Sequence, residues 1–286
     1  MEPSAKVIAD SAFGDNRVTT LEVVMHRFVL AEFNTHRRFS RNSASSRAIP
    51  VAKQLARVNT EPAIPLTWPA EQRGMQGGEP LGEDDAVWAE RVWLQARDAA
   101  VEHAEALTEI GVHKSVTNRL LEPFMWHTVV VTSVEWDNFF HQRCSPLAQP
   151  EIQAAAYAMR DAIKNSTPME LVDGMFHLPY LDGDTIVEID QAEHNALDVM
   201  CKVSAARCAR VSYLTQDGRR DYNEDLTLYE RLVTADPAHW SPLEHVCRPP
   251  LMHETSRDIG GKPMANFIPG NLAPFVQLRH IVSGEI

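Results

Sequence analysis

The chain has 286 residues and a formal net charge of −12, with 44% hydrophobic and 23% charged residues. This length fits one large domain or two small ones, and its core needs no metal or disulfide to fold. The acidic balance argues against nonspecific nucleic-acid binding, which depends on many phosphate contacts.

The sequence also argues against secretion and membrane insertion. Residues 1–6 lack the apolar stretch of a secretory signal. No apolar run approaches the ~18 residues that a membrane span needs. The cysteines form no CxxC pair; they are Cys144, Cys201, Cys208 and Cys247. We therefore expect a cytoplasmic protein with reduced cysteines.

The first elements in chain order are a strand and a short helix. The strand begins at Val18, and in it Leu21, Val23 and Met25 alternate with more polar residues. Residues 28–33 predict the helix. A basic cluster follows, and a proline closes it.

A loop and a long helix come next. Residues 60–84 are rich in proline and glycine, which predicts an irregular loop of the kind that forms a lid or an insertion. The alanine-rich residues 85–110 predict a helix that Gly111 ends. Its expected apolar face consists of Trp88, Val92, Ala96, Ala99 and Leu107.

Most of the elements predicted for the second half of the chain are helices. β-Branched residues predict a strand at 126–134. Thr132 and Glu135 have the spacing of a capping box, so we expect a helix from Glu135. Further helices are expected at 150–164, 192–213 and 225–235, and a loop-rich tail ends in an apolar segment at 275–282.

The run from Thr35 to Arg47 carries the densest chemical signal. Four arginines, four serines, one histidine and one asparagine lie between His36 and Arg47. Guanidinium groups match phosphate oxygens bidentately, and hydroxyls complete such sites. The run predicts a small phosphorylated ligand, with a solvated arginine-rich turn as the alternative.

The segment from His239 to His245 is a second candidate. Two histidines with Glu244 could bind a metal, but the spacing is not HExxH and no third ligand is obvious. A histidine and a glutamate fixed by the Ser-Pro turn could instead contact a cofactor.

Two further segments are ambiguous from their residues alone. Residues 205–213 are rich in small side chains and are typical of a tightly packed core helix. Arg119, Asn138 and Arg143 could serve a site or form surface ion pairs. Arg143 could also lower the pKa of the adjacent Cys144 thiol, although a buried, inert cysteine is commoner.

Together these segments resemble the flavin-dependent thymidylate synthases. The signature of that family is Arg-His-Arg, seven residues, then Ser; His36, Arg37 and Ser45 match it, with Thr35 in place of the first arginine. The other family blocks recur as Ala209-Arg210-Val211-Ser212, as His239, Ser241, Glu244 and His245, and as Asn138, Arg143, Ala148-Gln149 and Glu151-Ile152.

The order of these blocks differs from the usual one in the family. Usual members place the Ala-Arg-Val-Ser and Glu-His blocks before the signature, whereas here both follow it. Order within each half is preserved, as circular permutation would produce. Residues 1–170 would correspond to the usual C-terminal part and 192–247 to the usual N-terminal part, with irregular loops at 60–84 and 248–274.

The resemblance implies a fold and a reaction. The fold is a single, circularly permuted α+β domain over residues 1–286, with a central, mostly antiparallel sheet flanked by long helices. The reaction converts dUMP to dTMP; methylenetetrahydrofolate gives the carbon, and FAD reduced by NADPH gives the hydride. Family members are homotetramers with sites shared between subunits, so we expect a tetramer.

The resemblance also assigns site residues. Arg143 would be catalytic, because it would stabilise negative charge that develops on the pyrimidine. FAD would contact His36, Arg37, Arg38, Asn42, Asn138, Ser212, His239, Ser241 and Glu244. The nucleotide would contact Glu32, Ser45, Arg47, Arg119 and Arg143. No metal site is expected.

Three departures from the family pattern leave the substrate open. Thr35 replaces an arginine, Ser43 replaces an acidic residue, and Glu32 stands where a polar amide is common. They motivate a flavin-dependent dUMP or dCMP hydroxymethylase or methylase as the alternative. Two more hypotheses are a synthase with Cys144 as its nucleophile and a non-catalytic nucleotide-binding homologue.

Overall fold

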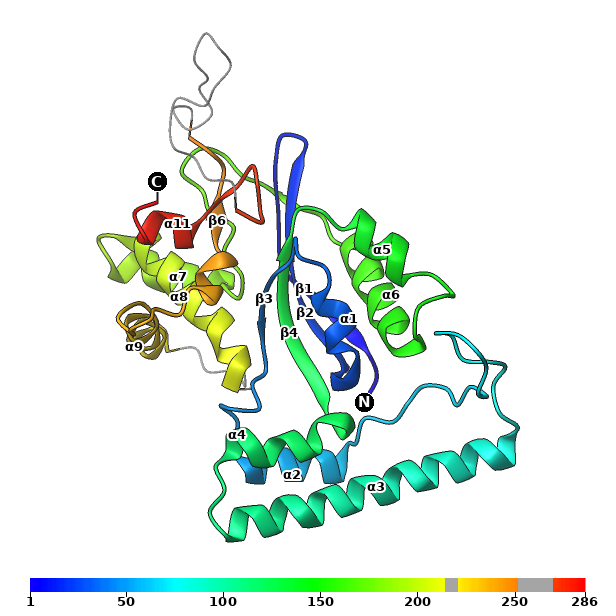
Figure 1. Ribbon diagram of the computed structural model, residues 1–286. Helices are drawn as coiled ribbons and strands as arrows, with labels where there is room; N and C mark the ends of the chain where they lie inside the picture. Colours follow the sequence, from blue (N-terminus) through cyan, green and yellow to red (C-terminus); the bar gives the residue numbers. More distant parts are fainter. Residues whose placement is uncertain (214–220, 252–269, 286) are drawn as a thin grey trace.

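The protein is described by a computed structural model over residues 1–213, 221–251 and 270–285. A five-stranded sheet with the order β3-β4-β2-β1-β5 forms its centre (Figure 1). Neighbouring strands are antiparallel except for β5, which runs parallel to β1. The strands are β1 (Ser4–Phe13), β2 (Asn16–His26), β3 (Ser40–Ser43), β4 (Trp126–Ser133) and β5 (Met169–Glu170).

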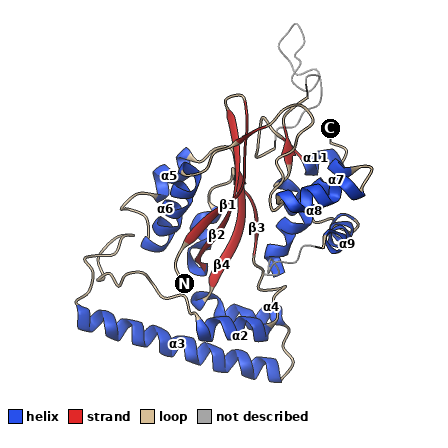
Figure 2. Cartoon of the chain, turned by 180° about the vertical axis from the view of Figure 1, so that it is seen from behind, coloured by secondary structure: helices blue, strands red, loops and turns tan. Residues whose placement is uncertain are grey.

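Helices cover both faces of this sheet (Figures 1 and 2). One face holds α1 (Leu30–Asn34), α5 (Asp137–Arg143) and α6 (Pro150–Lys164). The other holds α7 (Gly183–Ala192), α8 (Ala196–Arg210) and α9 (Tyr222–Val233). Across one end lie α2 (Val51–Thr60), α3 (Glu83–Glu109) and α4 (Lys114–Thr117). The expected α+β class with a mostly antiparallel sheet is confirmed.

Short elements complete the described chain. Four 3-10 helices are η1 (Arg27–Val29), η2 (Asn118–Phe124), η3 (Val211–Tyr213) and η4 (Ser241–Glu244). A separate two-stranded sheet pairs β6 (Cys247–Arg248) with β7 (Val276–Gln277), and α11 (Leu278–Val282) follows directly.

Side chains point alternately to the two faces of the sheet, so the sheet contributes to a separate hydrophobic core under each helical layer. Val129 and Val131 of β4 are fully buried in a cluster that includes Ile152 of α6. Val130, which points to the opposite face, packs with Cys208 of α8. Successive strand residues point to opposite faces, so one β4 segment supports both layers.

Several predicted elements lie close to their expected bounds, namely β2, β4, α3, α6, α8 and α9. The helix expected from Glu135 is wrong in its start, because α5 begins at Asp137 without a side-chain cap. Thr132 cannot cap it, since it is part of β4 and its hydroxyl is bound inside the core. β1, α2 and α7 were not predicted.

The apolar face expected for α3 is not buried within the chain. Trp88 is 58% exposed and Val92 45% exposed. The face that packs inward instead contains Ala104, with Trp93 and Val101. Gly111 does end the helix, in a left-handed conformation that favours glycine.

A short ordered segment lies at the predicted place near the C-terminus. Residues 276–282 form β7 and α11. Most of the expected loop at 248–274 lies outside the described residues, since 252–269 are not described. None of the described helices has the length and apolar character to cross a membrane.

A buried chain of polar side chains links the second half of the protein to the sheet. The hydroxyls of Thr20 and Thr132 lie 2.7 Å apart. His177 Nε2 lies 2.8 Å from Thr20, and His245 Nδ1 lies 2.8 Å from Thr132. Burial lowers the pKa of His177 to about 4 and that of His245 to about 3, so both rings are neutral near pH 7.

These two histidines predict that stability falls in mild acid. The unfolded chain protonates them below pH ~6.5, whereas the folded chain keeps them neutral. Their contribution is therefore present above that pH and is lost as the pH falls toward their folded pKa values. We expect each to remove about 1.5 kcal/mol from the free energy of unfolding between pH ~6.5 and pH ~5.

Urea unfolding at these two pH values measures this loss. In His177→Gln the free energy of unfolding should differ less between the two pH values than it does in the wild type. The exposed His103 provides a control, because His103→Gln should leave the difference as in the wild type. A wild-type stability that does not change between the two pH values would contradict the assignment.

Candidate functional site

The signature run lies where the two halves of the chain meet. It leaves α1 through a turn and then forms β3, the edge strand of the sheet beside β4 (Figure 1). Ser40 and Asn42 of β3 are buried, while Arg41 and Ser43 between them are partly exposed. The strand period therefore places alternate signature side chains inside the junction and at its surface.

The amide of Asn42 joins three segments that are far apart in the sequence. Its Nδ2 donates to the Cys208 carbonyl at 2.8 Å and to Ser212 Oγ at 3.4 Å. Its Oδ1 accepts from Ser241 Oγ at 3.1 Å. The Ser45 amide also donates to the Ser212 carbonyl at 3.0 Å. The signature, Ala-Arg-Val-Ser and Glu-His blocks are thus in direct contact.

Arg143 links the α5 block to the same run. Its guanidinium donates to His36 Nε2 at 3.0 Å, to the Glu32 carbonyl at 3.2 Å and to Thr35 Oγ1 at 3.1 Å. His36 must be neutral at Nε2 to accept this bond. Burial, with the charges of Arg143 and Arg41, lowers the pKa of His36 to about 4. Thr35 is therefore an acceptor for Arg143, where an arginine would repel it.

A first hollow of about 400 Å³ opens around these groups. Arg38 in its wall pairs with Glu135 at 2.8 Å, in an exposed ion pair of little energetic weight. The hollow carries an excess of positive charge and so suits an anionic ligand. Its lining residues are Thr35, His36, Arg37, Arg38, Phe39, Glu135, Asn138, Phe139, Gln142 and Arg143.

A second hollow of about 390 Å³ lies on the β3 side of the junction. Arg41 in its wall is half-buried, and burial lowers the pKa of its guanidinium. Arg27 and Arg119 share Glu122 Oε1 as an acceptor, at 3.1 and 2.7 Å. With its hydroxyls and amides, the hollow suits a phosphate. Its lining residues are Arg27, Leu30, Arg41, Asn42, Ser43, Ala44, Ser45, Ser46, Arg119 and Ser212.

The two hollows divide the predicted residues differently from the sequence assignment. Arg143, expected with the nucleotide set, lines the first hollow with His36 and Asn138. Asn42 and Ser212, expected with FAD, line the second hollow with Ser45 and Arg119.

Five predicted residues line neither hollow, and one of them, Ser241, donates instead to Asn42. Arg47 is exposed beyond β3, and the His239 amide donates to the Leu232 carbonyl. Glu244 forms an ion pair with Arg279 at 2.6 Å. Glu32 supplies its carbonyl to Arg143, while its Oε2 is buried and has no hydrogen-bond partner among the described residues.

The tail contributes contacts that the sequence did not indicate. Gln277 donates to Ser40 Oγ at 3.0 Å and to the Glu244 carbonyl at 2.7 Å. Arg279 holds the Glu244 side chain. The tail therefore fixes the Glu-His block against β3. Its only sequence signal was apolar residues, which gave no reason to select these two polar ones.

The geometry also corrects one hypothesis and leaves another without support. Burial raises the pKa of the Cys144 thiol, against the expectation that Arg143 lowers it. Among the described residues, no group of three or more His, Cys, Asp or Glu side chains could hold a metal ion. The core-helix interpretation of 205–213 is confirmed, since α8 is buried from Val203 to Arg210.

Comparison with known families decides the relationship of the chain. The family model for Thy1, described as thymidylate synthase complementing protein, matches residues 15–169, more than half of the chain. The chain belongs to this family. The match includes the signature run and the Arg143 block, and members of the family are flavin-dependent nucleotide methylases.

Solved structures give a weaker likeness. Two structures of PolB, a UMP/dUMP methylase from Streptomyces cacaoi, match with TM-scores of 0.45. The one with bound 5-Br dUMP is 16% identical and covers 57% of this chain and 90% of its own. The one with 5-Br UMP is 15% identical and covers 57% and 88%. No curated protein sequence matches.

Proposed function

We propose that the protein is an FAD-dependent thymidylate synthase, which methylates dUMP to dTMP with methylenetetrahydrofolate and NADPH. The contacts of Asn42 carry this proposal, because they unite the signature with two blocks 170 and 199 positions away. Such contacts are what a flavin site built from those blocks requires. When bound, FAD reduced by NADPH supplies the hydride.

The residues of the first hollow fit the binding of FAD. Arg37 and Arg38 supply cations for a diphosphate, and the one carboxylate among the described residues of the wall, Glu135, is paired with Arg38. Neutral His36 and the Asn138 amide supply hydrogen bonds. In this proposal His239, Ser241 and Glu244 support the Asn42 junction around the cofactor.

Arg143 orients and stabilises the pyrimidine. Three hydrogen bonds fix its guanidinium beside the signature turn, so little reorganisation is needed when negative charge develops on the ring. Ser45, Arg119 and Arg41 hold the nucleotide phosphate in the second hollow, and Arg47, which lies outside its lining, adds positive charge beyond β3. We propose a homotetramer in which the first hollow of one subunit meets the second hollow of another.

We also propose that the chain is a circular permutant of the usual family member. Its Ala-Arg-Val-Ser and Glu-His blocks come after the signature in sequence, yet Ser212 and Ser241 contact Asn42 directly. Circular permutation preserves such contacts because it moves only the chain ends.

A second candidate rests on Glu32. A buried carboxylate oxygen without a donor is unfavourable unless a ligand supplies an N–H group. The exocyclic amino group of cytosine is such a donor. This observation favours methylation or hydroxymethylation of dCMP as the second candidate.

Product analysis tests both candidates. Purified protein should take up FAD, lose its yellow colour with NADPH, and convert dUMP with methylenetetrahydrofolate to dTMP. Mass spectrometry of products from dUMP and dCMP distinguishes methyl from hydroxymethyl transfer and identifies the base. A protein that takes up no FAD would contradict the proposal.

Arg143→Ala should lower kcat by about 100-fold or more, because the charge that develops on the ring loses its cation. FAD uptake and the circular dichroism spectrum should stay near those of the wild type. Arg160→Ala is a matched control, since Arg160 is 47% exposed on α6 and stacks on Tyr157. A near-normal kcat in Arg143→Ala would show that this role is wrong.

A further inference from the structure

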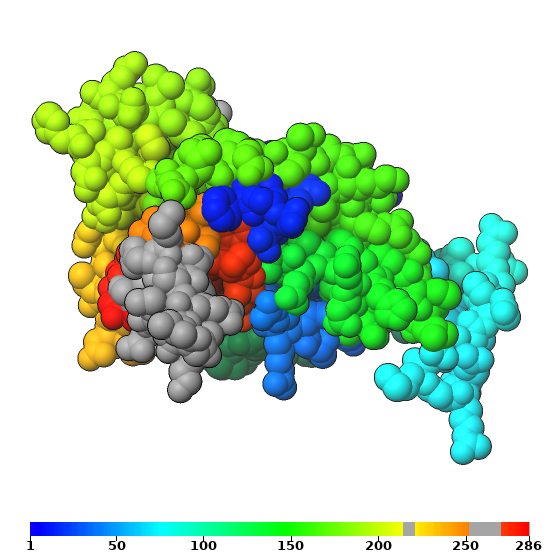
Figure 3. Space-filling model, turned by 90° about the horizontal axis from the view of Figure 1, so that it is seen from above, coloured from blue at the N-terminus to red at the C-terminus, as the bar shows by residue number. Residues whose placement is uncertain are grey.

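A third cavity, of about 750 Å³, lies between the loop at 60–84 and the start of α6. The loop and the adjoining start of α3, in cyan, project from the body of the molecule (Figure 3). Neither of the hollows described above shares the loop residues that line this cavity. The sequence offered either a lid or an insertion for this loop.

The loop has a defined internal structure. The Ala70 amide donates to the Glu79 carbonyl, and the Leu81 amide to the Trp68 carbonyl, both at 2.8 Å. Residues 68–81 therefore form a hairpin, which we call the loop hairpin. Gly77 packs so closely on Pro69 that a Cβ at position 77 would overlap the proline ring. The loop hairpin therefore forms an ordered wall of the cavity.

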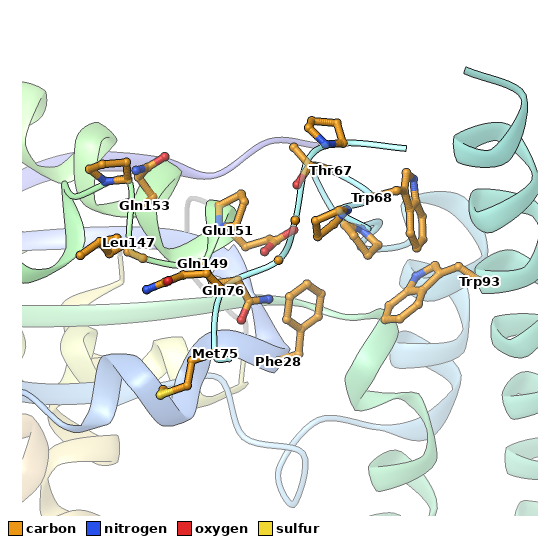
Figure 4. A pocket seen from close by; sticks show the side chains of 18 residues that line it. Phe28, Thr67, Trp68, Met75, Gln76, Trp93, Leu147, Gln149, Glu151 and Gln153 are labelled. Carbon is orange, nitrogen blue, oxygen red and sulfur yellow. The ribbon is translucent and has the colours of Figure 1, made fainter. Parts of the chain in front are cut away.

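Aromatic side chains form one side of the cavity (Figure 4). The Trp93 ring lies 6.2 Å from Trp68 and 6.0 Å from Phe28, both in edge-to-face geometry. The Trp93 indole N–H donates to the Ala63 carbonyl at 3.0 Å, which fixes its ring. Fixed indole and phenyl faces of this kind favour a flat aromatic ligand.

The polar side of the cavity is centred on Glu151. This residue is 2% exposed and lies in the first turn of α6, where the helix N-terminus favours a carboxylate. Its Oε1 accepts from the Leu66 amide at 2.8 Å. Within the described ranges, no residue is shown to donate to Oε2. A carboxylate that is almost fully buried is stabilised by a further N–H donor.

A second acceptor stands beside it. Gln153 also lines the cavity, and its Nε2 donates to the Ser145 carbonyl at 2.6 Å, so the acceptor Oε1 is the end of the amide that this bond does not use. The cavity therefore offers acceptors next to aromatic faces. This combination is complementary to a flat ring that carries neighbouring N–H donors.

We propose that this cavity binds a flat nitrogen heterocycle with an amino group beside a ring N–H, the edge shared by pterins and guanine. Glu151 accepts from that edge, and Trp68, Trp93 and Phe28 surround the ring. None of the cavity residues was assigned to FAD or to the pyrimidine nucleotide. For guanine the site goes beyond the proposed function, whereas for a pterin it rests on that function, because methylenetetrahydrofolate carries a pterin ring.

Calorimetric titration of the full-length protein with 6-methylpterin, guanosine and 6-methyllumazine tests this site. Lumazine presents a carbonyl in place of the amino group and would face the carboxylate with an acceptor. We expect 6-methylpterin or guanosine to bind at least ten times more tightly than 6-methyllumazine. Tighter binding of 6-methylpterin or of guanosine shows whether the ring belongs to a pterin or to guanine. Binding of neither, or equal binding of 6-methyllumazine, overturns the proposal.

Variants localise the binding to the cavity. Glu151→Gln can keep the bond to the Leu66 amide but removes the charge, so binding should weaken at least tenfold. Trp68→Leu should weaken it similarly without touching the carboxylate. Glu79→Gln makes the same charge change on the loop hairpin outside the cavity lining and should have no effect. Unchanged binding in both Glu151→Gln and Trp68→Leu overturns the proposal.

FAD uptake separates this site from the proposed function. Glu151→Gln should take up FAD as the wild type does. If the wild type takes up no FAD but binds 6-methylpterin through Glu151, the proposed function fails and the cavity assignment stands. If the wild type takes up FAD but binds no probe, the cavity assignment fails alone.

Discussion

The buried amide of Asn42 is the contact on which the arrangement of the site depends. A primary amide that is 9% exposed must find partners for both ends, because an unpaired buried amide is costly. Its partners come from two segments of the second half, the end of α8 and η4. The edge strand β3 can meet these segments because no further strand of the described sheet lies on its outer side.

The electrostatics of the region follow from its high arginine content. Four arginines lie within twelve residues of an acidic protein. Two of them have acceptors, since Arg38 pairs with Glu135 and Arg41 donates to the Phe33 carbonyl. His36 is neutral, Thr35 accepts from Arg143, and Glu122 holds two arginines of the second hollow. The positive charge that remains faces two hollows. Anionic ligands would complete this balance, in agreement with a family of flavin-dependent nucleotide methylases.

The sequence predicted the elements whose signals are local. The alternation in β2, the β-branched run of β4 and the alanine-rich α3 each have a period that fixes their type. The capping box at Thr132 failed because tertiary contacts used its hydroxyl. The exposed face of α3 shows that amphipathic spacing identifies an apolar stripe but not its partner. The tail contacts of Gln277 and Arg279 depend on long-range packing, which no local pattern contains.

In the proposed site, Asn42 unites the two halves of the chain around the flavin. The FAD dissociation constant of Asn42→Ala, measured by quenching of flavin fluorescence, tests it most directly. We expect Asn42→Ala to bind FAD at least tenfold more weakly than the wild type and to retain a cooperative unfolding transition. Wild-type FAD affinity in a folded Asn42→Ala protein would contradict it.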